Sequence, residues 1–301
     1  MAQFNNSNSI INNGEVHHSN LRHLPRRIIL VRHGESAANI DEQVYGNTPD
    51  HRISLSIDGI EQAREAGRKI LDMVNSSGNN NWNAYFYVSP YQRTKSTLRE
   101  IGRAFPRNRV AGVREECRIR EQDFGNFQDK AEMKKLKEDR DRYGRFFYRF
   151  PSGESGSDVY DRVSSFLESL WRDIDMNRLS IDPSAELNIV IVSHGLSIRV
   201  FLMRWFKWSA EQFDALKSPK NCEIRVLELG SSGEYSLAIQ HDDQTLQGWG
   251  LSPEMIDDQK QRANAKPGKY VWKERSPWYL NTFFDSVDSS DQVDGEKVDQ
   301  P

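Results

Sequence analysis

Residues 26–35 read Arg-Arg-Ile-Ile-Leu-Val-Arg-His-Gly-Glu. The apolar run Ile28 to Val31 contains β-branched side chains and is typical of a strand buried on both faces. The sequence then changes abruptly to the charged, glycine-bearing turn 32–35. Because ligands of open α/β sheets bind outside the carboxyl ends of the strands, this turn is a candidate site.

Further along the chain, strand-like runs alternate with amphipathic helical patterns. This alternation predicts an α/β sandwich with a mostly parallel sheet. Ser56 is a candidate N-cap for the first long helix. The expected strands are 28–31, 85–88, 109–113 and 188–192, and the expected helices are 57–74, 130–150, 158–174 and 196–206. Runs 223–229 and 235–240 flank a glycine-bearing turn and predict a hairpin.

The 301 residues divide into four expected segments. An Asn- and Ser-rich stretch, 1–24, is expected to be a disordered tail, and 25–243 to form the catalytic domain. Residues 244–284 are too aromatic for a free linker, so we expect an extension packed on the domain. The acidic stretch 285–301 is expected to be disordered.

Composition excludes several classes of protein. The net charge of −3 argues against a basic nucleic-acid-binding protein, and no run approaches the roughly 20 apolar residues of a membrane-spanning helix. Two cysteines, Cys117 and Cys222, cannot form a disulfide framework. We therefore expect a cytoplasmic protein with no membrane partner. An organelle transit peptide is the less favoured alternative, and the oligomeric state is left open.

Two strand-like runs each end in a His-Gly pair, at His33 and at His194. A third run ends just before Arg93. Because the carboxyl ends of parallel strands meet at one edge, both imidazoles should converge there with the guanidiniums of Arg32 and Arg93. Guanidinium forks match a phosphoryl group, and a neutral imidazole can attack phosphorus. The helix expected after Gly195 would add backbone donors.

This amount of fixed positive charge requires no metal, and we expect no cofactor. A leaving oxygen still needs a proton, and Glu121, on a turn-like segment, is the best candidate for the general acid. Asp123 is the reserve candidate. Glu35 is less suited because it lies beside the nucleophile.

Five ordered motifs carry a resemblance to a known family. They are Leu30–Asn39, Ser89–Thr94, Glu121–Gly125, Pro151–Ser155 and Ser193–Gly195, and they span about residues 25–240. Together they resemble the histidine phosphatase superfamily, the phosphoglycerate-mutase-like family. Within this family, the sequence most resembles the plant and fungal phosphoglycerate-mutase-like proteins.

The resemblance implies a three-layer α/β/α sandwich and a small phosphorylated metabolite as substrate. It implies that His33 is the phosphohistidine nucleophile and that Glu121 is the proton donor. Arg32, Arg93 and His194 would hold the phosphoryl group. Asn39 and the backbone of Gly195 would add hydrogen bonds, although Asn39 fits a turn residue equally well.

Phosphatases and mutases of this family share their chemistry and differ in whether water or a bound phosphoglycerate meets the phosphohistidine. The chain departs from mutases after Gly125, and the Lys- and Arg-rich segment 127–150 does not match the mutase lid. Hydrolysis is therefore favoured. The alternatives are a mutase-type isomerase of carbohydrate metabolism and a non-catalytic phosphate-binding protein. Arg162 is expected on a helix face or behind the site.

Overall fold

A single six-stranded sheet organises the chain, with the strand order β3-β2-β4-β1-β5-β6. The computed structural model describes residues 24–76, 78–125, 130–179, 181–182 and 184–270. The strands are β1 (Arg27–Arg32), β2 (Trp82–Val88), β3 (Val110–Glu115), β4 (Glu186–Ser193), β5 (Ile224–Leu229) and β6 (Tyr235–Ser236). The first four pair in parallel, and β5 and β6 are antiparallel additions at one side.

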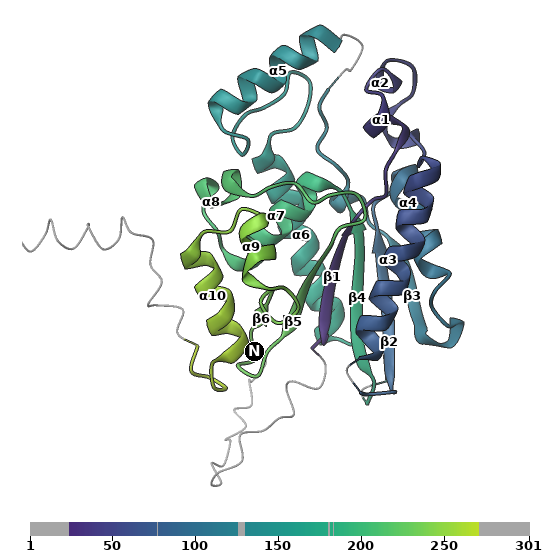
Figure 1. Ribbon diagram of the computed structural model, residues 1–301, viewed down its shortest axis with the longest axis vertical. Coiled ribbons are helices and arrows are strands. Elements are labelled where there is room, and N and C mark those ends of the chain that lie inside the picture. Colours follow the sequence, from purple (N-terminus) through teal and green to yellow (C-terminus); the bar gives the residue numbers. More distant parts are fainter. Residues whose placement is uncertain (1–23, 77, 126–129, 180, 183, 271–301) are drawn as a thin grey trace, which may run out of the picture.

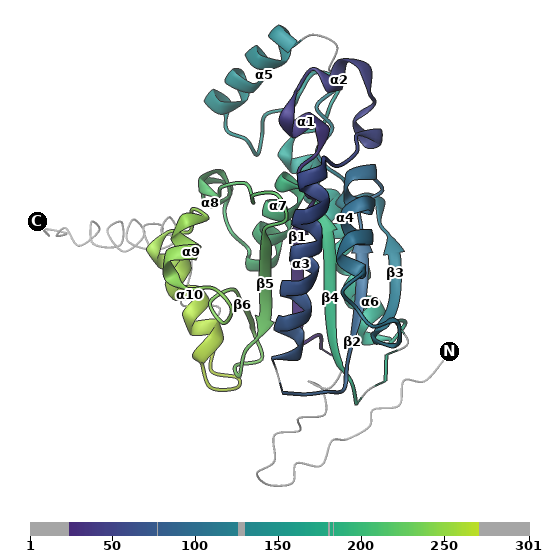
Figure 2. The same cartoon turned by 45° about the vertical axis from the view of Figure 1, so that its right-hand side comes forward.

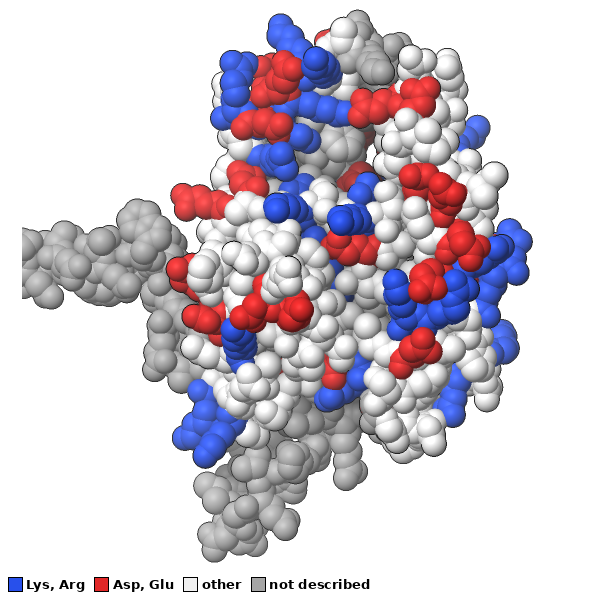
Figure 3. All heavy atoms as spheres, in the orientation of Figure 1, with Lys and Arg blue, Asp and Glu red and all other residues white. Residues whose placement is uncertain are grey.

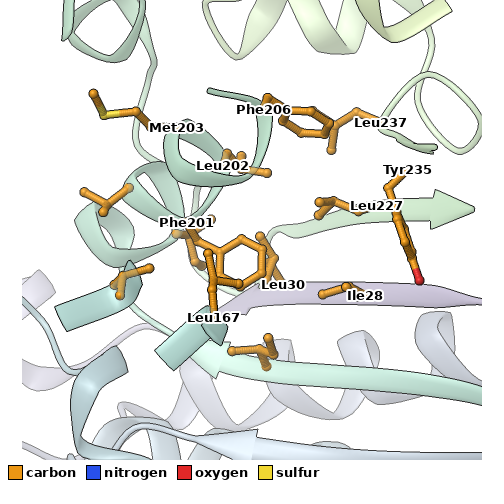
Figure 4. Close-up of a cluster of buried hydrophobic side chains, with 14 of the residues drawn as sticks. Ile28, Leu30, Leu167, Phe201, Leu202, Met203, Phe206, Leu227, Tyr235 and Leu237 are labelled. Carbon is orange, nitrogen blue, oxygen red and sulfur yellow. The ribbon is translucent and has the colours of Figure 1, made fainter. Parts of the chain in front are cut away.

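Helices cover both faces of this sheet (Figures 1 and 2). One face carries α3 (Ile57–Asn75) and α4 (Gln92–Gly102), and the other carries α6 (Gly156–Asp175) and α7 (Gly195–Phe206). Side chains of β1 alternate between the two layers. Ile29 and Val31 join the core under α3, while Ile28 and Leu30 join the core under α6 and α7 (Figure 4). The predicted three-layer, mostly parallel α/β/α sandwich is confirmed.

Shorter elements surround the sandwich. They are α1 (Ala37–Ile40), α2 (Val44–Asn47), α5 (Lys130–Tyr143), α8 (Ala210–Ala215), α9 (Asp243–Gly248), α10 (Pro253–Asn264) and the 3₁₀ turns η2 (Asp50–Arg52), η3 (Arg107–Arg109) and η4 (Cys117–Ile119). Helix α5 lies with α1 and α2 above the carboxyl ends of the parallel strands (Figures 1 and 2). We call α1, α2 and α5 the cap. Lys137 of α5 is 3.0 Å from the carboxylate of Glu42, between α1 and α2, and this ion pair joins the two parts of the cap.

Local capping chemistry starts the long helices. The Ser56 hydroxyl accepts a hydrogen bond from the Gly59 N–H at 2.9 Å, as its position before the apolar pattern predicts. Ser155 and Asp158 form a capping box, so α6 begins at Gly156, two residues before the expected start.

Two expected elements are shorter than predicted. The helix over 130–150 ends at Tyr143 because Gly144 adopts φ of +93°, a conformation that ends a helix. The strand over 235–240 is limited to two residues. Beyond its pairing with β5, Ser236 Oγ donates to the Gln259 carbonyl at 2.6 Å, and Leu237 N–H donates to the Gln259 side chain at 2.9 Å, so from Leu237 on the chain contacts α10 and the strand ends.

Of the expected aromatic extension, the structure describes residues 244–270. Trp249 is buried, and α10 packs beside β6. The segments 1–23 and 271–301, with both expected disordered tails, lie outside the described residues. Within the described part of the chain, every helix is too short or too polar to cross a membrane.

Packing of α3 on α4 depends on Gly67. A Cβ atom added there would lie 2.7 Å from the Ile101 carbonyl oxygen, closer than real contacts allow. We expect Gly67→Ala to lower the free energy of unfolding by about 1–3 kcal/mol through overpacking, measured by urea denaturation. Gly102→Ala is the matched control, since a Cβ at this helical glycine meets nothing within 4 Å. Equal stability of the two variants would refute this account of the α3–α4 contact.

Candidate active site

The parallel pairing of β1 with β4 brings the two histidines together. Arg32 pairs with Ser193 in the register, and one residue further each strand continues into a histidine. The His33 N–H donates to the Ser193 carbonyl at 3.0 Å, which extends the ladder to the nucleophile candidate. The rings of His33 and His194 are 5.3 Å apart, edge to face.

The ring of His33 is held in a defined tautomer. Its Nδ1 lies 2.7 Å from the Gly34 carbonyl oxygen. A carbonyl can only accept, so Nδ1 carries the proton and Nε2 keeps its lone pair when the ring is neutral. Burial, reinforced by the charges of Arg93 and Arg32, lowers the pKa of His33 well below 6.5. The site therefore favours a neutral imidazole with its Nε2 lone pair available.

His194 is fully buried at the start of α7. Its Nε2 lies 2.7 Å from the Ser89 hydroxyl, while its Nδ1 is buried with no hydrogen-bond partner among the described residues. Burial, followed by the Arg93 charge, also lowers the pKa of His194 well below 6.5. An unpaired buried ring nitrogen is costly, so it indicates a place for a ligand atom.

Arg93 reaches the site from the first turn of α4. Its Nη1 donates to the Asp50 carboxylate at 2.7 Å and to the Asp50 carbonyl at 2.8 Å. The guanidinium also lies over the Tyr91 ring, 4.8 Å from its centroid, and that ring contacts His194. Arg93 is 3% exposed, so Asp50 and Tyr91 fix the direction of a buried cation.

Arg32 closes the other side of the site. Its Nη1 donates to the Pro219 carbonyl at 2.7 Å, and its Nε is buried with no partner among the described residues. Burial lowers the pKa of this guanidinium, against the opposing effect of Glu121. We call His33, His194, Arg32 and Arg93 the cationic cradle, after its two guanidinium groups. It suits a tetrahedral oxyanion such as a phosphoryl group.

Glu121 lies on the loop that leads from η4 toward α5. Its charge acts on Arg32 in the cradle. It also helps to raise the pKa of Tyr91 to about 12, after the larger effects of burial and of Asp50. The Glu121 side chain accepts a hydrogen bond from its neighbour's N–H, Gln122, at 3.1 Å. These charge effects indicate a carboxyl group near the cradle, and the role of Glu121 as proton donor stays a prediction.

A buttress of Glu154 and Arg162 supports this loop. Arg162 donates to the Glu121 carbonyl at 3.0 Å and to the Glu154 carboxylate at 3.0 Å. Glu154 also accepts from Arg120 at 2.5 Å and from the Asp123 N–H at 3.0 Å. The role expected for Arg162, behind the site, agrees with these contacts. Glu154 stands in the motif Pro151–Ser155, and its link to the Glu121 loop is a tertiary contact.

The other predicted residues have varied surroundings. The Asn39 side-chain oxygen accepts from Ser36 and from Asn221, both at 3.1 Å, so it serves the turn after β1. Asp123, the reserve acid, accepts from the Gly125 N–H at 2.8 Å, and Glu35 accepts from Ser56 at 2.8 Å. Any contact of Asn39 with a ligand stays a prediction.

Sequence reasoning missed several residues of the site. Four of them each contact a predicted residue: Asp50, Ser89, Tyr91 and Asn221. Tyr45 is a fifth, because it acts electrostatically on the pKa of Arg32 and Glu121 acts on the pKa of Tyr45. Ser89 and Tyr91 stand in a motif that the sequence already singled out. Nothing in the local pattern marked the others. Among the described residues, no group of three or more His, Cys, Asp or Glu could hold a metal ion.

The chain is thus an α/β protein with a cationic cradle at the carboxyl edge of a parallel sheet, a place whose chemistry suits a phosphoryl-like anion. The chain belongs to the histidine phosphatase superfamily (branch 1), whose sequence pattern matches residues 28–242. The resemblance seen in the five motifs is therefore confirmed.

Curated relatives support the same family. The chain is 64% identical to the phosphoglycerate mutase-like protein AT74 of Arabidopsis thaliana, over 89% of this chain and 85% of the relative. It is 34% identical to the broad-range acid phosphatase DET1 of Saccharomyces cerevisiae, over 69% of this chain and 86% of the relative.

Solved structures share the fold. Mycobacterial hydrolase 1 matches with a TM-score of 0.53 and 22% identity, over 67% of this chain and 89% of that chain. Mycobacterial glucosyl-3-phosphoglycerate phosphatase Rv2419c, in its complex with VO3, also gives a TM-score of 0.53 at 22% identity, over 67% of this chain and 91% of that chain. At this identity the likeness concerns the fold alone.

The electrostatics of the cradle can be measured by NMR titration of the imidazole nitrogens. We expect His33 and His194 to titrate well below pH 6.5, because burial and two guanidiniums oppose protonation. Replacing Arg93 by Gln removes one positive charge and should move both pKa values upward. Titration of His33 near or above pH 6.5 in the unliganded protein would contradict the neutral nucleophile.

Proposed function

We propose that this protein is a phosphoryl-transfer enzyme that works through a phosphohistidine on His33 and hydrolyses small phosphomonoesters. The observation that carries the proposal is the hydrogen bond between His33 Nδ1 and the Gly34 carbonyl. It leaves a neutral Nε2 in a cradle with His194 and two guanidiniums. A nucleophile poised beside anion-binding groups is what phosphoryl transfer needs.

In the first step, His33 Nε2 attacks phosphorus. The N–P bond forms while the bond from phosphorus to the ester oxygen breaks, and the electron pair leaves with that oxygen. Arg32 and Arg93 neutralise the charge on the equatorial oxygens, and the N-terminus of α7 at Gly195 adds backbone donors. Glu121, in its protonated form, gives its proton to the leaving alcohol.

In the second step, water replaces the alcohol. The Glu121 carboxylate left by the first step takes a proton from water as the water oxygen attacks phosphorus. The N–P bond breaks, inorganic phosphate leaves, and His33 returns to its neutral state. The Glu154–Arg162 buttress keeps the backbone of Glu121 at the cradle through both steps.

Two observations bear on whether the reaction is hydrolysis or isomerisation. The acid phosphatase relative is 34% identical, and it matches over most of its own length. The relative at 64% identity carries a mutase-like name, so a phosphoglycerate mutase-type isomerase of carbohydrate metabolism is the second candidate. A non-catalytic phosphate-binding role is the third, and the presence of a nucleophile, a cradle and an acid in one place weighs against it.

We propose that residues 25–243 form the catalytic domain and that 244–270, the described part of the extension expected over 244–284, packs on it. The cap formed by α1, α2 and α5 overhangs the strand ends, and Figure 3 shows charged side chains of both signs over α5 with a hollow beside them. A small phosphorylated metabolite in the cytoplasm is the proposed substrate.

The proposal is tested by phosphate release from a panel of phosphomonoesters that includes both phosphoglycerates and sugar phosphates, in the presence of chelator. We expect release by the wild type, and a loss of at least about 1,000-fold in His33→Ala because the nucleophile is gone. Isotopically labelled substrate should leave an acid-labile label on the wild type alone. Isomer interconversion is followed in the same samples.

His51→Ala is the matched control, because His51 is an exposed histidine that directly follows Asp50 in the sequence. It should keep most of the activity. Interconversion of phosphoglycerate isomers without release of phosphate would show a mutase and overturn the proposed hydrolase. Release that survives in His33→Ala would overturn the phosphohistidine mechanism.

A further inference from the structure

The segment 216–222, which we call the strap, runs along the edge of the cradle between α8 and β5. Three guanidinium groups hold its backbone by the carbonyl oxygens. The hydrogen bonds are Arg199 Nη1 to Leu216 at 3.1 Å, Arg225 Nη2 to Lys217 at 3.1 Å and Arg32 Nη1 to Pro219 at 2.7 Å. All three guanidiniums are mostly buried, so the backbone of the strap is anchored to the interior of the protein.

The far end of the strap is joined to the nucleophile. Asn221 Nδ2 donates to the His33 carbonyl at 3.2 Å. The Cys222 N–H, at a residue with φ of +54°, lies 3.1 Å from the Arg32 carbonyl and 3.3 Å from the His33 carbonyl. Any group on the strap therefore has a defined position relative to His33.

Ser218 is exposed in the middle of the strap, and its hydroxyl has no hydrogen-bond partner among the described residues. A Cβ atom added to Gly195 would lie 3.4 Å from Ser218 Oγ and 3.8 Å from Arg32 Nε. Ser218 Oγ and Arg32 Nε thus both lie close to Gly195, at the start of α7. Arg32 Nε is itself buried and unpaired within the described chain.

Hydrogen-bond donors therefore lie close together at the start of α7. Gly195 is the first residue of the twelve-residue helix α7, whose first N–H groups lack partners within the helix. Arg32 Nε can only donate, and a serine hydroxyl can donate in any direction that its rotation allows. An anion with several oxygens satisfies such a set, whereas a neutral apolar group does not.

We propose that Ser218 is a further substrate-binding residue, whose hydroxyl donates to an oxygen of the bound phosphoryl group beside Arg32 and the N-terminus of α7. The inference rests on the proposed function for the identity of the anion. The strap then has two tasks, since through Pro219 it orients Arg32 and through Ser218 it adds a donor. Both are in place before the anion arrives, which lowers the cost of binding.

Binding of inorganic phosphate, measured by calorimetry on the full chain, tests this assignment without turnover. We expect Ser218→Ala to weaken the Kd by about 10-fold, the effect of one hydrogen bond to a charged group. Ser218→Thr keeps the hydroxyl and should stay within about 3-fold of the wild type. Ser218→Asp places a like charge against the anion and should weaken the Kd by at least about 100-fold. Ser231→Ala, at an exposed serine on the β5–β6 turn, is the matched control and should change nothing.

An equal Kd for the wild type and Ser218→Ala would overturn the assignment, whatever Ser218→Asp does. An equally large loss of affinity in Ser218→Thr and Ser218→Ala would also overturn it, because packing and not the hydroxyl would then be responsible. A wild type that binds no phosphate would overturn it as well. A wild type that binds phosphate but releases none from esters would overturn the proposed hydrolase alone, and the Kd series would still decide on Ser218.

Discussion

The parallel pairing of β1 with β4 is the constraint on which the site depends. Its register sets Val31 opposite Val192 and Arg32 opposite Ser193, so that the residue after each strand is a histidine at the same height. A slip by one residue would turn one imidazole toward the opposite layer. The register cannot slip easily, because the alternating side chains of β1 are buried in two separate cores. Core packing therefore decides the distance between His33 and His194.

The second constraint is the burial of positive charge. Arg32 and Arg93 lie beside two imidazoles with little exposure, and an arrangement of this kind is unfavourable unless each guanidinium has partners. The protein supplies a carboxylate for Arg93, from Asp50, and a backbone carbonyl for Arg32, from Pro219. Asp50 receives hydrogen bonds from both terminal nitrogens of Arg93, whereas Pro219 engages only Nη1 of Arg32, whose Nε stays unpaired among the described residues. The cradle is thus oriented in advance and keeps unsatisfied capacity for an anion, while both histidines stay neutral.

Much of the fold and of the candidate site could be predicted because the signals are local. The run Ile28 to Val31, the cap at Ser56 and the His-Gly pairs each act within a few residues of themselves. Errors arose where a distant contact or a single backbone angle decides. The helix over 130–150 ends at Tyr143 because the next residue, Gly144, has a positive φ, and the strand expected over 235–240 ends where Ser236 and Leu237 donate hydrogen bonds to Gln259. Asp50 and Glu154 could not be assigned because their partners are far away in the chain.

By itself, the sequence determined the layered α/β architecture and the family, and it named candidates for the nucleophile, the cradle and the acid, since periodicity and motif order are carried by neighbours along the chain. The tertiary structure alone decided which atoms of those residues are free. The tautomer of His33 follows from the Gly34 carbonyl, the direction of Arg93 from Asp50, and the place of Ser218 from three guanidiniums that clamp the strap. Hydrogen bonds saturate and have direction, so the chemistry left to each group depends on neighbours that only folding provides.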